Sequence, residues 1–432
     1  MGTILRNGNI LVDGELVKRD ILIEENVIQA IAEGLNSEGH KVVDVTGKLI
    51  TPGFIDMHVH LREPGFEAKE TIATGTASAA RGGFTTVACM PNTRPVIDTP
   101  DTVQHILRKA EEEGSARVLP IGAITVRELG RELTDMAALK EAGVMAVSDD
   151  GVGIQTSQMM KDAMKMATDL GLPVIAHCED DSLAEGGCVH EGVFSEKHGL
   201  KGIPSEAESI HVGRDILLAE ATGAHYHVCH ISTVESVRLV REAKQRGACV
   251  TAEVCPHHLL LCDEDIPGLD ANYKMNPPLR SRRDRDALIE GLKDGTIDMI
   301  VTDHAPHTEE EKQRSMELAP FGIVGLETAF PLLYTKLVLP GIFTLQEIVD
   351  RMTKTPAEVF HLPWGTLAEG AAADIAVIDI ETEKEVDPTA FASKGRNTPF
   401  TGWKLKGWPV LTMLEGRIVW QSEEMNSEGA KQ

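Results

Sequence analysis

The chain has 432 residues, 42% of them hydrophobic, and a formal net charge of −25 at pH 7. This length leaves room for one large domain and a smaller one, and the charge argues against binding to nucleic acid or to an anionic membrane. An anionic small-molecule substrate remains compatible with it, because one or two placed arginines suffice to bind a carboxylate. No apolar run approaches the ~18 residues of a membrane span, and the N-terminus lacks a signal-peptide pattern.

The seven cysteines show no Cys-x-x-Cys spacing, which is not the pattern of a disulfide framework. Cys89, Cys178, Cys229, Cys249 and Cys255 all fall in or beside apolar, strand-like runs. We therefore expect buried free thiols and a cytoplasmic location.

The first part of the chain predicts short strands and turns without helical periodicity. Apolar stretches lie at 3–8, 20–24 and 42–45, with turn signals at Asn7-Gly8 and Thr46-Gly47.

From Pro52 onward the pattern changes, because apolar strand candidates now alternate with helical stretches. The strands are predicted at 55–60, 84–89, 117–123, 144–148, 173–177, 225–230, 248–254 and 298–303. The helices between them are predicted at 68–80, 99–113, 157–170, 206–222, 234–246 and 283–293. Roughly eight strand–helix units in about 300 residues indicate a TIM-like (β/α)8 barrel over residues 51–364. An open doubly wound sheet is the alternative, weakened because no Gly-x-Gly-x-x-Gly follows the first strand.

Strand patterns return after Trp364, at 373–379 and 410–419. We expect the two chain ends to pair into one small β-sandwich domain, built from residues 1–50 and 365–432. The overall class is therefore α/β.

Five predicted barrel strands end in a histidine or an aspartate, where packing alone predicts an apolar residue. Any one of them is more often a hydrogen-bonded residue at the edge of the core than a metal ligand. In a (β/α)8 barrel, however, all strands end at the face that carries the active site, so their agreement favours one shared site. The residues are His58 and His60 on strand one, Asp149 and Asp150 on strand four, His177 on strand five, His230 on strand six, and Asp303 on strand eight.

Imidazole and carboxylate ligands suit Zn²⁺, Mn²⁺ or Co²⁺. His58 and His60 are two apart on one strand, so they point the same way and can bind the same ion. The set is large enough for two metals about 3.5 Å apart sharing a hydroxide, which is a nucleophile at neutral pH. A carboxylate on strand eight can take its proton and pass it to a leaving nitrogen, which is the chemistry of amide hydrolysis.

The sequence resembles the amidohydrolase superfamily and, within it, the bacterial-type dihydroorotases, over nearly the whole chain. The superfamily as a whole shares His58-x-His60. More specific motifs are His-Leu-Arg-Glu-Pro-Gly at 60–65, Met-Pro-Asn at 90–92 and Met-Asn-Pro-Pro-Leu-Arg at 275–280. Further matches lie at 148–151, 177–179, 230–232 and 302–307.

The resemblance implies the reversible cyclisation of N-carbamoyl-L-aspartate to L-dihydroorotate and water in pyrimidine (UMP) synthesis. The reaction would use a metal-bound hydroxide with Asp303 as the general acid/base. The resemblance also implies two Zn²⁺ ions per subunit and a homodimer. The implied metal ligands are His58, His60, Asp150, His177, His230 and Asp303.

Substrate contacts implied by the resemblance cluster at the same mouth of the barrel. The planar guanidinium of Arg62 can bind the carboxylate of dihydroorotate. Asn92 and Asn276 can offer amide hydrogen bonds, although turn-forming asparagines are common, and His307 could be an ordinary loop histidine. The full implied set is His60, Leu61, Arg62, Asn92, Asn276, His307, Phe321 and Gly322.

One position departs from the superfamily pattern. Many binuclear members bridge their metals with a carbamylated lysine at the end of strand four, where this chain has Ser148-Asp149-Asp150. Either Asp150 bridges two metals, or only one metal binds firmly. We favour the bridge, and Asp150 over Asp149, because the residue beside Gly151 matches the family pattern.

Two alternatives remain for the activity. Dihydropyrimidinases, hydantoinases and allantoinases share the barrel and the His-x-His pair, but they usually carry the strand-four lysine and their uncharged substrates do not need Arg62. A non-catalytic structural partner in pyrimidine synthesis should have lost ligands, and none is missing.

The polar residues 308–320 predict either a mobile flap over the site or a plain solvated loop.

Overall fold

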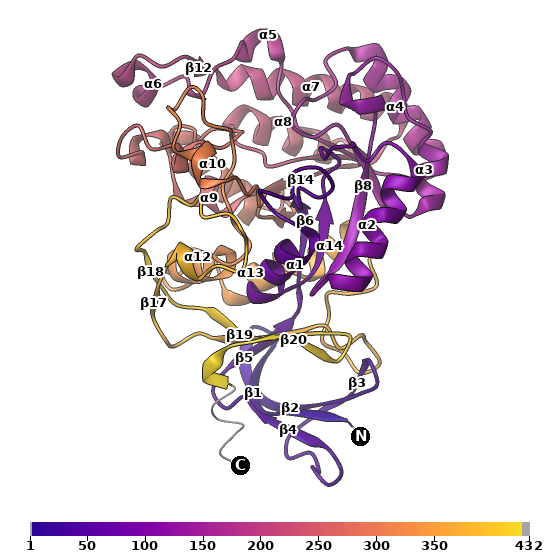
Figure 1. Cartoon of the computed structure of the whole chain (residues 1–432), viewed down its shortest axis with the longest axis vertical. Helices are drawn as coiled ribbons and strands as arrows, with labels where there is room; N and C mark the ends of the chain where they lie inside the picture. The colour runs from indigo at the N-terminus through magenta and orange to yellow at the C-terminus, as the bar shows by residue number, and fades with distance from the viewer. Residues whose placement is uncertain (1, 426–432) are drawn as a thin grey trace.

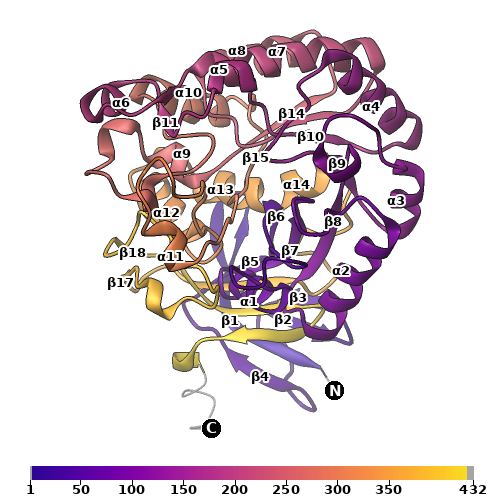
Figure 2. The ribbon, with the colours of Figure 1, turned by 45° about the horizontal axis from the view of Figure 1, so that its top comes forward.

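The computed structural model describes residues 2–425. Eight parallel strands form the barrel, in the order β15-β14-β13-β10-β9-β8-β7-β6 (Figures 1 and 2). A parallel bridge between Val59 and His304 closes it, with the His60 amide donating to the His304 carbonyl at 2.8 Å. The predicted (β/α)8 barrel is therefore confirmed. Its strands are β6 (Phe54–Val59), β7 (Phe84–Cys89), β8 (Arg117–Ala123), β9 (Ala146–Ser148), β10 (Val174–Ala176), β13 (Tyr226–Val228), β14 (Val250–Val254) and β15 (Met299–Ile300).

The barrel strands are mostly apolar because both of their faces are buried, as is usual for parallel sheets. Ile55 and Met57 of β6 face an inner cluster that also contains Ile121 and Ile175. Phe54 belongs instead to the larger outer cluster that fills the space between strands and helices.

Helices surround the barrel and return the chain to its amino-terminal end. Local signals fix their ends: Thr99 caps the helix that starts at Pro100, and Gly171 adopts a left-handed conformation after Leu170. The long ones are α1 (Ile72–Arg81), α2 (Pro100–Glu113), α3 (Met136–Ala142), α4 (Ser157–Leu170), α7 (Ser205–Thr222), α8 (Val234–Gln245), α10 (Arg282–Lys293) and α13 (Leu345–Met352). The short ones are α5 (Asp181–Ala184), α6 (Val193–His198), α9 (Pro256–Leu260), α11 (Glu309–Lys312), α12 (Ala329–Leu333), which runs into a π-helical turn (Tyr334–Val338), and α14 (Lys354–Val359).

The two chain ends pair in a second sheet of eight strands beneath the barrel (Figure 1). The joint is the antiparallel pairing of β5 with β16, in which Ile50 lies opposite Val377. Strands predicted at both ends thus do meet, while the proposed domain boundaries stay a prediction. The strands are β1 (Thr3–Val12), β2 (Glu15–Glu24), β3 (Val27–Ala32), β4 (Lys41–Asp44), β5 (Leu49–Pro52), β16 (Ile375–Asp379), β19 (Trp408–Leu414) and β20 (Arg417–Gln421).

The segment between β16 and β19 leaves this sheet and packs on the barrel. It contains a small antiparallel pair, β17 (Lys384–Glu385) and β18 (Lys404–Leu405). Phe391 and Phe400 join an apolar cluster with Met275 and Ile323, which come from loops at the carboxyl ends of the barrel strands. The C-terminal part of the chain therefore supports the face at which those strands end. A second small pair, β11 (Val189–His190) with β12 (Gly202–Ile203), lies at the same end of the barrel.

All seven cysteines are free thiols. Burial is confirmed for Cys89, Cys178, Cys229 and Cys255, but the prediction was wrong for Cys249, which is exposed. Cys249 lies in the loop just before β14, outside the packed part of its apolar run. Within residues 2–425, no helix combines the length and apolarity needed to cross a membrane.

Candidate active site

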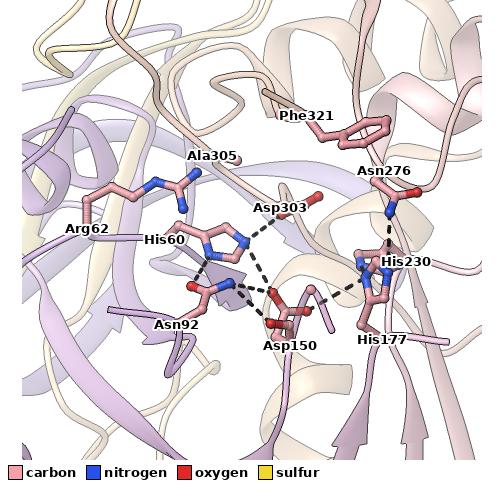
Figure 3. Close-up of a pocket in the computed structure, with 12 residues that line it drawn as sticks. His60, Arg62, Asn92, Asp150, His177, His230, Asn276, Asp303, Ala305 and Phe321 are labelled. Carbon is pink, nitrogen blue, oxygen red and sulfur yellow. Dashed lines mark hydrogen bonds and ion pairs between the residues drawn. The ribbon is translucent and has the colours of Figure 1, made fainter. Parts of the chain in front are cut away.

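A pocket of about 140 Å³ opens where the barrel strands end (Figure 3). Ten of the predicted site residues line it, although they come from segments as far apart in the sequence as His60 and Gly322. Of the remaining three, His58 is buried directly beneath, and Leu61 and His307 lie outside the lining. The pocket is lined by His60, Arg62, Asn92, Asp150, Gly151, His177, His230, Asn276, Asp303, Ala305, Phe321 and Gly322.

Three of these residues have left-handed backbones that side-chain-bearing residues rarely adopt. The φ angles are 62° at Arg62, 27° at His230 and 48° at Asp303. Each follows a barrel strand and turns its side chain toward the pocket. Such conformations cost of order 1–3 kcal/mol and concentrate at functional sites, where the surrounding fold holds them.

The predicted ligands form two triads. In the first, ligand atoms of His58, His60 and Asp303 all lie within 4.8 Å of one another. In the second, the same limit holds for Asp150, His177 and His230. Asp150 also joins the two triads, because its Oδ1 lies 3.5 Å from His58 Nε2 and its Oδ2 lies 3.6 Å from His60 Nε2.

Hydrogen bonds fix which nitrogen of each strand-one histidine faces the pocket. His58 Nδ1 donates to Glu253 Oε1 at 2.7 Å, and His60 Nδ1 donates to Asn92 Oδ1 at 2.9 Å. In a neutral imidazole the other nitrogen then carries a lone pair, so both Nε2 atoms are acceptors. They face carboxylates, which are also acceptors.

A cation between these groups would satisfy all of them. His58 Nε2 and Asp150 Oδ1 are buried and have no hydrogen-bond partner among residues 2–425. Unpartnered acceptors facing one another, from imidazoles whose tautomer is fixed by a carboxylate or amide, are the arrangement of a metal site. The donor set therefore fits Zn²⁺ or a similar divalent ion.

Glu253 of β14 contacts the candidate ligand His58 and was not predicted from the sequence. Its carboxylate is fully buried and accepts from His58 and, at 3.0 Å, from His227 Nε2. Burial alone would raise the pKa of Glu253, but the two histidines lower it to about 2. The sequence does carry a signal for this residue, because Glu253 is the single acidic residue within the strand 250–254.

The two acids after β9 have different surroundings. Asp150 lines the pocket, whereas Asp149 turns away and accepts from the backbone amides of Ile124 at 2.8 Å and Thr125 at 2.9 Å. Burial raises the pKa of Asp149 to about 6. The geometry thus offers Asp150, and not Asp149, to a metal ion.

The positive charge of Arg62 reaches the pocket from the loop after β6 (Figure 3). Its Nε donates to the Pro306 carbonyl at 3.2 Å, and burial lowers its pKa only to about 10, so it stays charged at neutral pH. Next to it, His307 Nε2 donates to the Phe321 carbonyl at 2.7 Å. Burial and the charges of Arg62 and Lys69 hold the pKa of His307 far below its usual value, so it is a neutral donor.

Asn276 faces the pocket from the opposite side. Its Nδ2 donates to Glu179 Oε2 at 3.1 Å, while its buried Oδ1 has no hydrogen-bond partner among the described residues. A free amide oxygen beside the ligand triads is suited to accept from a substrate N–H.

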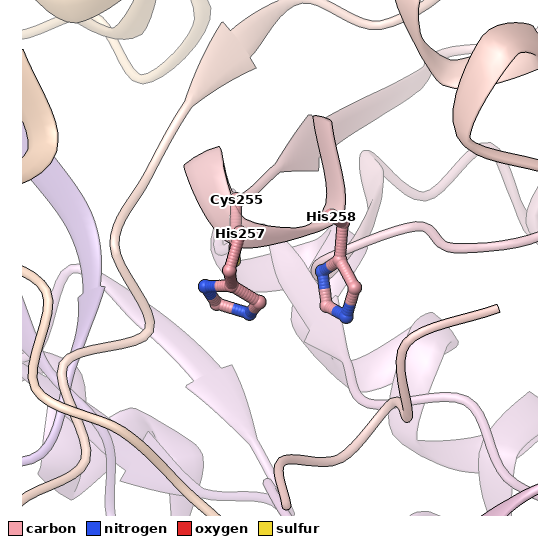
Figure 4. A group of neighbouring side chains, drawn as sticks. All are labelled: Cys255, His257 and His258. Carbon is pink, nitrogen blue, oxygen red and sulfur yellow. The ribbon is translucent and has the colours of Figure 1, made fainter. Parts of the chain in front are cut away.

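A second compact group supports the turn after Asn276. Cys255, His257 and His258 lie together at the start of α9, buried and outside the pocket (Figure 4). His258 Nε2 donates to the Pro277 carbonyl at 2.9 Å. This bond ties the residue after Asn276 to α9.

Leu61 does not line the pocket. The Leu61 side chain is in the outer core, where its Cδ2 would lie 2.6 Å from a Cβ added to Gly75 of α1. Only its backbone is left to contact a substrate.

The segment 308–320 begins with α11 and runs to the pocket wall at Phe321. Its flap role stays a prediction.

Solved structures with this fold include proteins named dihydropyrimidinase and hydantoinase. The chain matches a dihydropyrimidinase from Brevibacillus agri with a TM-score of 0.86 and 25% identity, over 98% of this chain and 95% of that one. It matches an L-hydantoinase (dihydropyrimidinase) from Arthrobacter aurescens with a TM-score of 0.87 and 26% identity, over 97% and 96%. Fold and pocket together define the class as a cyclic amidohydrolase.

Sequence relatives narrow the class. A family model described as dihydro-orotase-like matches residues 47–236. A dihydroorotase from Halalkalibacterium halodurans is 62% identical over 98% of this chain and 100% of its own length. One from Brevibacillus brevis is 64% identical over the same shares. The chain belongs to the dihydroorotase family.

Proposed function

We propose that this enzyme interconverts N-carbamoyl-L-aspartate and L-dihydroorotate in pyrimidine synthesis. The observation that carries the proposal is the presence of Arg62, charged and half-buried, in the same pocket as Asp303 and the ligand triads. A cyclic amide that bears a carboxylate matches this combination, because the guanidinium binds the carboxylate while the ring amide faces the triads.

The residues that would hold metal are His58, His60 and Asp303 for one ion and His177 and His230 for another, with Asp150 between them. Two Zn²⁺ ions held there, with Asp150 as a shared ligand, would satisfy His58 Nε2 and Asp150 Oδ1, which have no hydrogen-bond partner among residues 2–425. When bound, such ions polarise a carbonyl oxygen and lower the pKa of water.

Asp303 is the proposed general acid/base. In ring opening it accepts a proton from the attacking water and delivers it to the departing ring nitrogen, and in ring closure it does the reverse. Asp303 Oδ1 lies 3.0 Å from His60 Nε2, which places the carboxylate among the proposed metal ligands in the pocket lining. Arg62, Asn92, Asn276, His307 and the Phe321–Gly322 backbone orient the substrate around it.

The alternative activities fit this chain less well. The structural neighbours named dihydropyrimidinase and hydantoinase are only 25–26% identical, against 62–64% for the relatives named dihydroorotase. The strand-four position holds Ser148-Asp149-Asp150, with no lysine. All six proposed ligands are present around the pocket, which argues against a purely structural partner.

One assay tests the proposal. The purified enzyme with Zn²⁺ should interconvert dihydroorotate and carbamoyl-aspartate, with hydantoin and dihydrouracil as uncharged control rings. Faster turnover of the uncharged rings would overturn the substrate assignment.

Seven free thiols support a reducing compartment, and we place the enzyme in the cytoplasm. The homodimer rests on the family resemblance alone, and sedimentation equilibrium of the purified protein tests it.

A further inference from the structure

Lys312, at the end of α11, carries a buried ammonium group with three backbone acceptors. The residue is 8% exposed. Its Nζ donates to the carbonyls of Lys274 at 3.2 Å, Pro320 at 3.0 Å and Gly322 at 2.9 Å. Three acceptors use all three of its protons.

These acceptors belong to two segments that face the pocket. Lys274 begins the segment that contains Asn276, and Pro320 and Gly322 flank Phe321, which lies beside Asn276 in the pocket lining (Figure 3). The Gly322 amide also donates to the Lys274 carbonyl at 3.0 Å, so the two segments touch directly. Lys312 donates to both segments and does not itself line the pocket.

Asn397 completes the arrangement from the C-terminal part of the chain. Its Nδ2 donates to the carbonyls of Gly322 and Ala305, both at 3.0 Å, and its Oδ1 accepts from the His307 amide at 3.2 Å. Lys312 and Asn397 therefore share one acceptor, the Gly322 carbonyl. Through it they connect the walls at 274–276 and 320–322 to the loop after Asp303.

A buried ammonium is a costly way to fill this space. Among residues 2–425 it makes no salt bridge within 4.0 Å. Burial lowers the pKa of Lys312 to about 7, which reflects that cost. An apolar side chain would avoid the cost but would leave three carbonyls without donors. Lysine at this position therefore supplies donors to the three carbonyls at a cost in desolvation.

We propose that Lys312 and Asn397 are positioning residues that hold the Phe321–Gly322 wall against the Asn276 segment and thereby set substrate affinity. Neither side chain lines the pocket, so they act through the backbone of Gly322. Within the predicted flap 308–320, Lys312 donates to the carbonyl of Pro320, the last residue of the segment. The kinetic part of the inference rests on the proposed function, whereas the structural part does not.

The experiment compares Lys312→Met and Asn397→Ala with the wild-type enzyme, with Lys244→Met as the matched control. Lys244 also donates to a backbone carbonyl, that of Gly295, but lies on α8 away from the pocket. We expect KM for dihydroorotate to rise about tenfold in both variants, with kcat nearly unchanged, because the catalytic groups stay in place. The control should match the wild type.

Hydrogen exchange of the Gly322 amide supplies a readout that does not depend on turnover. Its bond to the Lys274 carbonyl should open more often in both variants, so exchange should speed up by about tenfold. If Lys312→Met fails to fold, Asn397→Ala decides, since it removes no charge. Unchanged KM together with unchanged Gly322 exchange would overturn the inference. A wild-type enzyme without dihydroorotase turnover would overturn the proposed function, while the exchange data would still decide the positioning role.

Discussion

Asp303 Oδ1 lies 3.0 Å from His60 Nε2, although both atoms are acceptors when the imidazole is neutral. The tautomer is fixed because His60 Nδ1 donates to Asn92 Oδ1 at 2.9 Å. A proton on His60 or a metal ion between the two atoms is needed to make the contact favourable. His58 repeats the pattern, since its Nε2 lies 3.5 Å from the same Asp303 oxygen. Two such contacts on one carboxylate favour the metal ion.

Asp303→Asn should therefore remove both a metal ligand charge and the proton acceptor. We expect kcat/KM to fall by about 10²–10⁴-fold in both reaction directions, the usual contribution of a positioned general acid/base. The measurement is turnover of dihydroorotate and of carbamoyl-aspartate, with the metal content of the variant determined in parallel. Wild-type turnover in Asp303→Asn would exclude Asp303 as the general acid/base.

Asp150 and Asp149 offer a matched pair for testing the metal bridge. Asp150→Ala should lower the zinc content, because Asp150 lies between the two triads. Asp149→Ala should keep its zinc but lose about 1–3 kcal/mol of unfolding free energy, since the Ile124 and Thr125 amides lose their acceptor. Elemental analysis and urea unfolding measure the two effects. Equal zinc in wild type and Asp150→Ala would contradict the bridge.

The barrel was readable from the sequence because its strands are buried on both faces. The strands predicted at 84–89 and 117–123 coincide with β7 and β8, where continuous apolar runs stop at turns. The convergence of the strand ends was also predictable, since all strands of such a barrel end at one face. The polar residues that interrupt apolar runs at those ends, such as His177 and His230, do line one pocket.

The supporting contacts were less accessible, for physical reasons. Glu253 left a visible signal, a lone acid in an apolar strand, but its partner His58 is 195 residues away. Lys312 left none, because its acceptors are backbone carbonyls, which every residue carries. Leu61 was predicted as a substrate contact from the family resemblance, yet its side chain packs in the outer core. Sequence patterns thus identify burial and periodicity better than the partners of individual polar groups.

Arg62→Met tests the selection of an acidic ring. Removing the guanidinium should weaken dihydroorotate binding by ~2–4 kcal/mol, the cost of an ionic hydrogen-bonded contact left unmade. Turnover of dihydrouracil, which lacks the carboxylate, should change far less. The KM values for dihydroorotate and for dihydrouracil, and the inhibition of dihydrouracil turnover by dihydroorotate, measure the difference. Unchanged affinity for dihydroorotate would remove Arg62 from this role.

Gly322→Ala tests the close packing of the pocket wall. Gly322 has a φ of 128°, and an added Cβ would lie 2.7 Å from the Ala305 Cβ and 3.2 Å from His307 Nε2. Gly341→Ala is the control, because Gly341 also has a positive φ, 76°, but an added Cβ meets no atom within 4 Å.

Both substitutions should lose about 1–2 kcal/mol of unfolding free energy from the left-handed backbone. Only Gly322→Ala should lose more, and only it should raise KM, because its Cβ displaces the wall that His307 and Lys312 hold. Urea unfolding and steady-state kinetics on the two variants separate backbone strain from the steric contact. Equal losses of stability and an unchanged KM in Gly322→Ala would show that the wall can yield, and that the close approach of Gly322 to Ala305 does not shape the pocket.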